Sequence, residues 1–297
     1  MSNLYIGTSG WVYGHWEGIF YPEDLPSKDK PPHQYLGGGG KLKYYSQYFK
    51  TVEINYSFYH LPRPSTYQNW YSQTPDDFLF AVKASRFITH IKRLKGVHPI
   101  KSAEGGAKQF DGVKDAWEQF LENTLNLKEK LGPILFQFPP SFQATDENLK
   151  RLEEFLKLIT KNLYPKPYTL KFAFEFRHKS FCDEKIYKLL KKYNVAWVIA
   201  DSPRYPYIET LKKFRSGRSA EGGNRPRADV VTADFVYIRM HGSKIMFASK
   251  YTKEELKDLA KKIKKWLKQK LDVYVYFNND FRGYAIENAK ELLNYFK

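Results

Sequence analysis

Charged and polar side chains gather near the ends of the predicted strands, in types suited to acid/base chemistry on an anionic molecule. The set comprises Glu53, Glu175, Asp201, Lys83, Arg177, Arg239, His241, Asn55, Gln137, Asn278 and Thr8. Two carboxylates in unlike environments acquire different pKa values and can act as proton donor and acceptor. We predict these two catalytic roles for Glu175 and Glu53, with His241 as a second general acid.

The other members of this set, joined by one aromatic residue, are predicted to bind the substrate, because cations hold an anionic group and stabilise developing negative charge. They are Thr8, Trp11, Asn55, Lys83, Gln137, Arg177, Asp201, Arg239 and Asn278. Trp11, Tyr13 and Trp16 follow the first predicted strand closely, and they would either stack on a base or sugar ring or form a lid. If the two carboxylates lie about 5–10 Å apart across an open cleft, glycoside hydrolysis joins the candidate reactions.

Spacing within the strands gives these side chains a common direction. Side chains of a strand alternate between its two faces, so residues two apart share a face. The pairs Glu53 and Asn55, Glu175 and Arg177, and Arg239 and His241 are each two apart, and the residues between and beside them are apolar. The polar set is therefore predicted to face the interior of a barrel, where burying a charge is costly unless it is paired.

Two explanations fit such a polar interior. The first is an ion-pair plug that fills a wide barrel, and the second is a ligand site at the barrel mouth. A plug needs only one or two satisfied pairs. Because the set holds six charged residues and several further polar groups, we favour the site.

Metal and cofactor signals are weak. The sequence has no HExxH motif, no paired cysteines, no GxSxG motif and no phosphate-binding glycine fingerprint. Of the seven histidines, only His241, His90 and His178 reach candidate site positions. No cofactor is predicted, and a single divalent cation held by Glu53, Glu175 and Asp201 is the alternative, since hard cations prefer oxygen ligands.

Runs of β-branched and aromatic residues alternate with segments of helical periodicity along the chain. Strands are predicted to begin near Leu4, Val52, Phe78, Ile134, Leu170, Ala196, Phe235 and Val273. Helices are predicted over 42–49, 66–73, 111–129, 146–160, 183–193, 252–271 and 286–296, with Asp146 and Thr252 as N-caps. After the sixth strand only 208–214 has a weak helical pattern, so that helix is short or replaced by a basic loop.

Eight strands alternating with helices predict an α/β fold, a (β/α)8 TIM-like barrel. A doubly wound open sheet is the structural alternative. The even spacing of the elements favours the barrel, and no GxGxxG motif follows the first strand. No linker divides the chain, so residues 1–297 are predicted to form a single TIM-barrel domain.

The chain is strongly basic, with 49 Lys and Arg against 32 Asp and Glu among its 297 residues, and a net charge of +17. This balance is typical of nucleic-acid binders, but also of the lysine-rich surfaces of heat-adapted proteins. Many of the lysines lie on one face of the amphipathic segment 252–271, which favours a solvated surface. The basic stretch 202–232 would either clamp phosphates or form a disordered insertion.

The cysteine content, the N-terminal residues and the length of the apolar runs indicate the compartment and the partners of the protein. The only cysteine is Cys182, the N-terminal residues do not form a secretory signal pattern, and no apolar run has the length of a membrane span. We expect a cytoplasmic protein whose partner is a small anionic substrate, with nucleic acid as an alternative and no membrane contact. The sequence does not indicate an oligomeric state.

Several blocks of the sequence match a known family in order. They are GTSGW at 7–11, FYP at 20–22, TVEINYSFYHLP at 51–62, FAVKASRFITH at 80–90, GPILFQFPPSF at 132–142, FEFRHKSF at 174–181, VYIRMHG at 236–242, and YFNND with GYA within 276–285. The chain thereby resembles the YecE-like family, also known as domain of unknown function 72. This resemblance implies a TIM-like barrel and no established activity.

The chain departs from the family pattern at one block and differs from other proteins that share the barrel fold. The family's FRH block usually ends in Ser-Trp, whereas this chain has Ser180 and Phe181. TIM-barrel endonucleases that use several metals share the fold, but this sequence lacks their histidine-rich ligand set.

Three functions compete at this point. The first is an enzyme doing hydrolase- or lyase-type acid/base chemistry on an anionic, phosphate-bearing or nucleotide-like substrate at the C-terminal mouth of the barrel. The second is a nucleic-acid-binding or DNA-repair-type barrel without a multi-zinc site, which requires a continuous basic stripe around the mouth. The third is a non-catalytic ligand-binding barrel, which is favoured if every interior charge is paired and no cleft remains.

Overall fold

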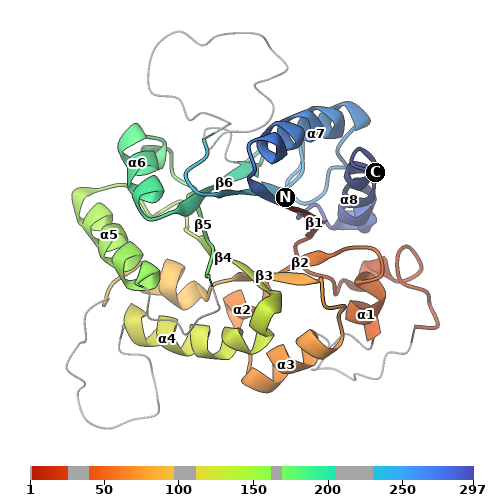
Figure 1. Cartoon of the computed structure of the whole chain (residues 1–297), viewed down its shortest axis with the longest axis horizontal. Helices are drawn as coiled ribbons and strands as arrows, with labels where there is room; N and C mark the ends of the chain where they lie inside the picture. The colour runs from red at the N-terminus through yellow and green to blue at the C-terminus, as the bar shows by residue number, and fades with distance from the viewer. Residues whose placement is uncertain (1, 26–39, 97–111, 162–168, 205–229) are drawn as a thin grey trace.

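Eight parallel strands form the centre of the molecule, and helices surround them (Figure 1). The structure is a computed structural model that describes residues 2–25, 40–96, 112–161, 169–204 and 230–297. The strands are β1 (Leu4–Thr8), β2 (Thr51–Ile54), β3 (Leu79–Lys83), β4 (Leu131–Gln137), β5 (Phe172–Glu175), β6 (Val195–Asp201), β7 (Phe235–Met240) and β8 (Asp272–Phe277). Their order in the sheet is β1-β8-β7-β6-β5-β4-β3-β2, which confirms the predicted (β/α)8 arrangement.

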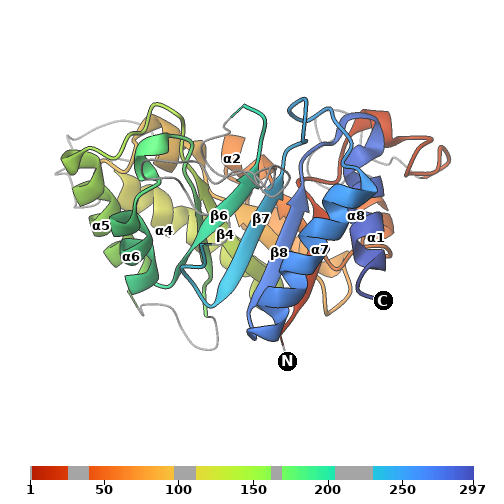
Figure 2. The same ribbon diagram turned by 90° about the horizontal axis from the view of Figure 1, so that it is seen from above.

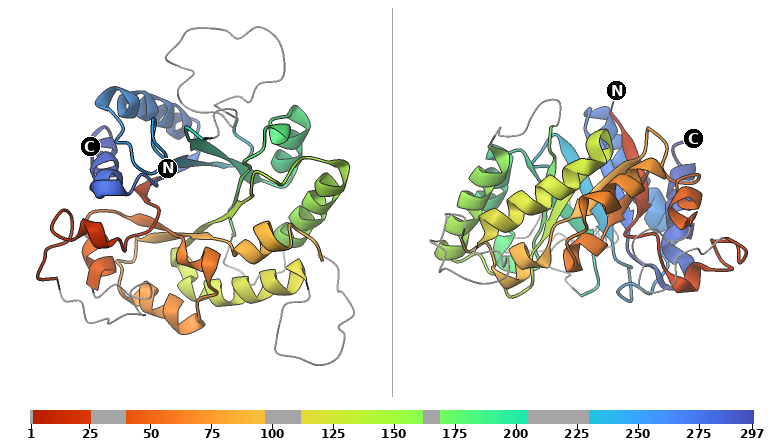
Figure 3. Two further views of the ribbon diagram at one scale, coloured as in Figure 1. Left: turned by 180° about the vertical axis from the view of Figure 1, so that it is seen from behind. Right: turned by 90° about the horizontal axis from the view of Figure 1, so that it is seen from below.

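Helices of the described residues form a ring outside the strands, as the views from behind and from below also show (Figure 3). They are α1 (Lys41–Tyr45), α2 (Tyr56–Tyr59), α3 (Pro64–Ser72), α4 (Val113–Thr124), α5 (Asp146–Thr160), α6 (Glu184–Lys192), α7 (Lys253–Lys268) and α8 (Tyr284–Asn294). Short helical turns occur at η1 (Gly14–Trp16), η4 (Phe87–Ile91), η5 (Leu125–Lys130), η6 (Lys179–Phe181) and η8 (Phe281–Gly283). The weak helix candidate at 208–214 and most of the basic stretch 202–232 lie outside the described residues.

Helix ends follow local side-chain chemistry. Thr252 caps α7 as predicted, and it forms a capping box with Glu255. The predicted cap Asp146 is wrong, because the side chain of Thr145 accepts the hydrogen bond from the Asn148 amide and Asp146 is already helical. An acid in the first turn suits the positive end of the helix dipole, so Asp146 stabilises α5 in a different role.

The barrel interior is apolar in its lower part and polar toward its C-terminal mouth. Its lower part is filled by Ala81, Leu135, Ala173, Ala196, Val198, Phe235, Tyr237, Tyr274 and Tyr276, which form one apolar cluster. Positions two residues further along five of these strands carry Lys83, Gln137, Glu175, Arg239 and Asn278. Because the side-chain period of a strand is two, these polar groups continue the same inward-facing rows toward the C-terminal mouth.

The apolar residues between them face the helices and form a larger outer cluster. Helix α5 illustrates why, since Leu152, Phe155, Leu156 and Ile159 recur at helical spacing and are all buried. Phe155 meets Phe136 of β4 with ring centroids 5.1 Å apart. Burial of these aromatic and aliphatic side chains fixes the helices on the outside of the barrel.

Strands β1 and β2 close the barrel at its mouth without a regular ladder. Ser9, directly after β1, forms a single parallel bridge with Glu53. The Gly10 N–H donates a hydrogen bond to the Glu53 carbonyl oxygen at 2.8 Å. The seam between the first and second strands is therefore held at few backbone points.

Further from the mouth, the hydroxyl of Tyr45 connects the backbones of β1 and β2. The Tyr45 hydroxyl accepts from the Thr8 N–H at 2.9 Å and donates to the Thr51 carbonyl oxygen at 3.1 Å. The backbones approach closely at Gly7, where an added Cβ would lie 2.2 Å from the Thr51 carbonyl oxygen. Only glycine fits this approach.

No helix in the described ranges combines the length and apolar character needed to cross a membrane.

Candidate functional site

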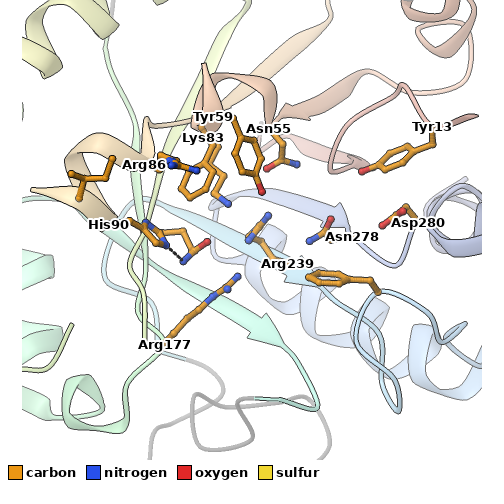
Figure 4. Close-up of a pocket in the computed structure, with 14 residues that line it drawn as sticks. Tyr13, Asn55, Tyr59, Lys83, Arg86, His90, Arg177, Arg239, Asn278 and Asp280 are labelled. Atoms are coloured by element: carbon orange, nitrogen blue, oxygen red, sulfur yellow. Dashed lines mark hydrogen bonds between the residues drawn. The ribbon is translucent and has the colours of Figure 1, made fainter. Parts of the chain in front are cut away.

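A pocket of about 570 Å³ opens at the C-terminal ends of the strands (Figure 4). Seen from the side, the arrows of β6, β7 and β8 all point toward this end of the barrel (Figure 2). The lining residues are Tyr13, Asn55, Phe58, Tyr59, Lys83, Arg86, His90, Ile91, Gln137, Arg177, Arg239, Phe247, Asn278 and Asp280. The structure thus brings together six predicted substrate-binding residues, namely Asn55, Lys83, Gln137, Arg177, Arg239 and Asn278, at the place expected for a TIM-barrel site.

Arg239 forms the floor of the pocket and binds both predicted catalytic carboxylates. Its Nε and Nη2 donate to the Glu53 carboxylate at 3.0 and 2.7 Å, and its Nη1 donates to Glu175 at 2.6 Å. All three side chains are at most 2% exposed. A guanidinium presents several donors in a rigid plane, so one arginine can satisfy two carboxylates at once.

Further donors complete the bonding of both carboxylates. Ser9 and Tyr237 each donate a hydroxyl hydrogen bond to Glu53 at 2.7 Å. Arg177 donates from Nε to Glu175 at 2.8 Å. Ser9 and Tyr237 are not among the predicted site residues, although Tyr237 lies two residues before Arg239 and strand alternation places it on the same face.

This bonding is inconsistent with the predicted donor and acceptor roles. Burial alone would raise the pKa of Glu175, but the guanidiniums of Arg239 and Arg177 hold it well below its usual range. The carboxylates of Glu53 and Glu175 share the single guanidinium of Arg239 beneath the pocket, and neither lines it. They do not face each other across an open cleft, so the arrangement expected for glycoside hydrolysis is not present.

His241 lies beside this cluster, outside the pocket lining. Its side chain is 1% exposed, and its Nδ1 accepts a hydrogen bond from the Asn278 amide at 3.0 Å. Burial and the nearby Arg239 charge lower the pKa of His241 well below its usual range, so the imidazole is neutral. Its Nε2 has no hydrogen-bond partner among the described residues and lies 4.0 Å from Glu175. The predicted role as a second general acid therefore requires access that this geometry does not provide.

Lys83 differs from its neighbours because its charge is not satisfied. The side chain is 8% exposed and faces the pocket, with its Nζ 3.8 Å from the centroid of the Phe58 ring. No described group lies within hydrogen-bond or ion-pair distance of Nζ. Burial, followed by repulsion from Arg239 and Arg177, lowers the pKa of Lys83 from 10.5 to about 7. The amine can therefore gain or lose a proton near neutral pH.

The rim of the pocket combines cationic, imidazole and apolar groups. Arg86 is exposed, and His90 receives a hydrogen bond from the Gln137 amide at 3.4 Å. Burial and the nearby Lys83 charge lower the pKa of His90 to about 4, which keeps it neutral. Tyr59 is 63% exposed. Tyr59 ends the short helix α2 after β2, and Arg86 and His90 belong to the start and the body of η4 after β3. Both segments are too short for a periodic pattern to mark them.

Thr8 and Asp201 do not face the interior, so this part of the prediction is wrong. The Thr8 hydroxyl donates to the Gly10 carbonyl oxygen and to Tyr45, which belongs to a surrounding helix. Asp201 is paired in register with Met240, whose side chain belongs to the outer cluster, and it lies against the Tyr251 hydroxyl.

The alternative cation site is not assembled either. Asp201 lies on the opposite face of the sheet from Glu53 and Glu175, and both glutamates are already bonded to Arg239. In the part of the chain that the structure describes, no three His, Cys, Asp or Glu side chains are grouped in a way that would hold a metal ion.

Trp11 lies in a second, more apolar pocket of about 430 Å³. This pocket is lined by Gly10, Trp11, Val12, Tyr13, Asn55, Tyr56, Tyr59 and His60. It shares Tyr13, Asn55 and Tyr59 with the first pocket, so the two adjoin at the barrel mouth. Trp16 is fully buried and donates to the Asp280 carbonyl oxygen, which leaves it no face for stacking on a ligand.

Replacing Lys83 with methionine is expected to raise the free energy of unfolding by roughly 1–3 kcal/mol at pH 6, because the variant no longer buries a charge. In the folded protein the amine is charged below pH 7 and neutral above it, whereas in the unfolded chain it stays charged up to about pH 10.5. The cost of charge burial is thus complete below pH 7 and disappears toward pH 10.5. Urea unfolding at pH 6 and pH 9.5 should show the advantage of the variant shrinking as pH rises.

Lys130 provides the matched control for this substitution. It is 2% exposed, but its Nζ donates to the carbonyl oxygens of Tyr71 and Thr74 at 2.8 and 2.7 Å. Lys130→Met removes these bonds and should lower stability by about 1–3 kcal/mol. A Lys83→Met protein that is destabilised at pH 6 like Lys130→Met would contradict our account of Lys83.

Fold and site together define a class: a TIM-barrel protein whose mouth holds a cation-rich pocket above a buried arginine–carboxylate cluster. The chain belongs to the family described as protein of unknown function DUF72, whose sequence model matches residues 5–297. The predicted resemblance is thereby confirmed.

Relatives from several bacteria support this assignment. The chain is 28% identical to the UPF0759 protein YunF of Bacillus subtilis, over 98% of this chain and 93% of that protein. It is 24% identical to the UPF0759 protein YecE of Escherichia coli O157:H7, over 81% and 74%. The crystal structure of a DUF72 family protein from Thermotoga maritima is similar with a TM-score of 0.72 and 28% identity, covering 98% of each chain.

Proposed function

We propose that this protein is an enzyme that binds a small molecule bearing a phosphate or carboxylate group in the pocket at the barrel mouth. The observation that carries the proposal is Lys83, a nearly buried ammonium that faces the pocket without a partner. A buried cation is costly unless it is paired, so a ligand anion is the natural partner.

The charges around the pocket support an anionic ligand. Glu53 and Glu175 are engaged by Arg239 and Arg177, so the Lys83 and Arg86 charges are not balanced by these carboxylates. Figure 4 shows the ends of Lys83, Arg177 and Arg239 directed toward one shared space. A low-dielectric pocket with convergent cations attracts an anion more strongly than the same groups would in water.

Lys83 takes over the proton-transfer role that the sequence suggested for the carboxylates. A group with a pKa near 7 can both accept and donate a proton at neutral pH. The two glutamates then have a positioning role, because their hydrogen bonds fix Arg239 and Arg177 at the pocket floor. Hydrolase- or lyase-type acid/base chemistry remains our proposal, with Lys83 as its centre.

The open cleft argues against a purely structural ion-pair plug. A plug would pair every charge and leave no volume, whereas here about 570 Å³ stays open above Arg239. The adjoining aromatic pocket favours a ligand with a ring next to its anionic group, such as a nucleotide-like molecule. Tyr59, which lines both pockets, would contact such a ring.

Binding of a nucleic-acid strand is less well supported. Helix α7 carries the exposed Lys257, Lys261, Lys264, Lys265 and Lys268, and it lies on the outside of the barrel against β8 (Figure 2). These lysines are not part of the pocket lining, whose cationic side chains are Lys83, Arg86, Arg177 and Arg239. A concave site of this volume suits a small ligand better than a duplex.

Calorimetric titration with inorganic phosphate and with AMP tests the proposal on the full-length protein. We expect both ligands to bind, and Lys83→Met to weaken phosphate binding at least tenfold, equivalent to about 1.4 kcal/mol. Lys50→Met is the matched control, because Lys50 is exposed and precedes β2 at the opposite end of the barrel. Tyr59→Ala should weaken AMP binding and leave phosphate binding unchanged.

Two results would overturn the proposal. One is the absence of phosphate and AMP binding at millimolar concentrations. The other is equal affinity of Lys83→Met and Lys50→Met for phosphate, since the bound anion would then lie elsewhere. Binding to single-stranded DNA that outcompetes AMP and persists in Lys83→Met would support the nucleic-acid alternative.

A further inference from the structure

The Lys83 amine is placed more like a nucleophile than like a simple anion anchor. An anchoring lysine usually keeps its ammonium hydrated and exposed, whereas Lys83 is 92% buried with its Nζ over the Phe58 ring. The charges that act on it are those of Arg239, Arg177, Glu175 and Glu53. Burial and the contact with the Phe58 ring place the amine within the lining of the pocket.

These same surroundings make a neutral amine available. With a pKa of about 7, about half of the Lys83 side chains are neutral at pH 7, against roughly one in a few thousand for a lysine of ordinary pKa. Desolvation and cationic neighbours are the conditions under which a lysine amine attacks a carbonyl group. The charged groups that set this state come from β2, β5 and β7, and from the residues that follow β5.

We propose that Lys83 forms an imine with the carbonyl carbon of a small anionic substrate, such as a 2-oxo acid or a phosphorylated aldehyde or ketone. In this step a C–N bond forms between Nζ and the carbonyl carbon. The carbonyl oxygen leaves as water with the two hydrogens of the neutral amine, so neither oxidant nor reductant is needed. The inference rests on the proposed anion pocket and names the substrate class that the pocket accepts.

The rest of the pocket suits such a substrate. Arg177 and Arg86 are placed to bind its carboxylate or phosphate, and the amides of Asn55, Gln137 and Asn278 line the same space. Amide side chains can donate to the carbonyl oxygen and to the departing water. The neighbouring aromatic pocket can accept the remainder of the molecule.

Reductive trapping tests the imine directly. Full-length protein is incubated with pyruvate at pH 7 and reduced with sodium cyanoborohydride, followed by intact-mass analysis and peptide mapping. We expect one adduct, with a mass gain of one pyruvate minus one water plus two hydrogens, located on Lys83. The Lys83→Met protein should lose it, and the Lys50→Met protein should keep it. Excess inorganic phosphate should slow its formation in the wild type.

A smaller probe keeps the test independent of the substrate's identity. Formaldehyde with the same reductant methylates lysines through imines, and at pH 6.5 Lys83 should react at least tenfold faster than Lys50. Uniform methylation, or pyruvate adducts spread over surface lysines and unchanged in Lys83→Met, would overturn the imine proposal. If phosphate binding still depends on Lys83 in that case, the proposed function stands without the imine, and the two failures are therefore distinguishable.

Discussion

Replacing Arg239 with methionine is expected to lower the free energy of unfolding by about 3–5 kcal/mol at pH 7, because two buried carboxylates lose their common partner. Arg239 is 1% exposed and bonds Glu53 twice and Glu175 once. Methionine keeps part of the apolar stem but supplies no donor. Urea unfolding followed by intrinsic tryptophan fluorescence would measure the loss.

The pH dependence of this loss separates charge burial from lost packing. In the wild type the lowered pKa of Glu175 contributes stability above about pH 4.3, and this contribution is lost as pH falls through the folded-state value. Without Arg239 the burial of Glu175 dominates and raises its pKa. Protonation of Glu175 then removes the buried charge as pH falls, which raises the free energy of unfolding of the variant. The difference between the two proteins should therefore shrink from pH 7 toward pH 4.

Arg151 offers a control with the same substitution. It forms a surface ion pair with Glu147 one turn away on α5, and such pairs contribute about 0.3–0.5 kcal/mol. Arg151→Met should accordingly change stability little. An Arg239→Met protein no less stable than Arg151→Met would show that the cluster does not hold the barrel mouth together.

Gly7→Ala is expected to lower the free energy of unfolding by about 3 kcal/mol or more, because the new methyl group forces the first and second strands apart. The added Cβ would lie 2.2 Å from the Thr51 carbonyl oxygen and 3.0 Å from the Tyr45 hydroxyl. The backbone oxygen cannot rotate away as a flexible side chain could. Both the strand contact and the hydrogen bonds of Tyr45 would be disturbed.

Gly14→Ala is the matched control for this experiment, because a Cβ at Gly14 meets no atom within 4 Å. Thermal unfolding of both variants, followed by circular dichroism, would compare them directly. Equal melting temperatures for Gly7→Ala and Gly14→Ala would show that the seam between the strands tolerates widening. The Gly7 variant should also bind phosphate more weakly, because Ser9 and Glu53 meet at the same seam.

The alternation of polar and apolar residues predicted which side chains face the interior only in strands with one polar and one apolar face. Glu53, Glu175 and Arg239 lie in such strands, and all three side chains meet in the interior. Strand β6 is apolar on both faces, so its alternation carries no signal and Asp201 could not be assigned to a face. Thr8 was selected by its position at a strand end, whereas the alternation in β1 places Ser9 inside.

The bonding between the site residues could not be predicted from the sequence. Nothing in the spacing of Glu53 and Glu175 indicates that Arg239 binds both, because the partners are 186 and 64 residues apart along the chain. Whether a carboxylate is open to substrate or engaged by a guanidinium depends on distances of a few tenths of an ångström. For this reason the sequence could not show that Arg239 engages both glutamates, or that Lys83 has no bonded partner among the described residues.

The amino-acid sequence by itself determined the eightfold alternation of strands and helices and the barrel, because hydrophobic periodicity and helix capping are local properties of the chain. It also determined which end of the barrel carries the polar residues, since the ends of parallel strands share one direction. Only the tertiary structure decided which charges neutralise each other and that Lys83 faces the open pocket without a bonded partner among the described residues. Pairing and desolvation depend on the positions of all surrounding groups at once, and these groups come from strands far apart in the chain.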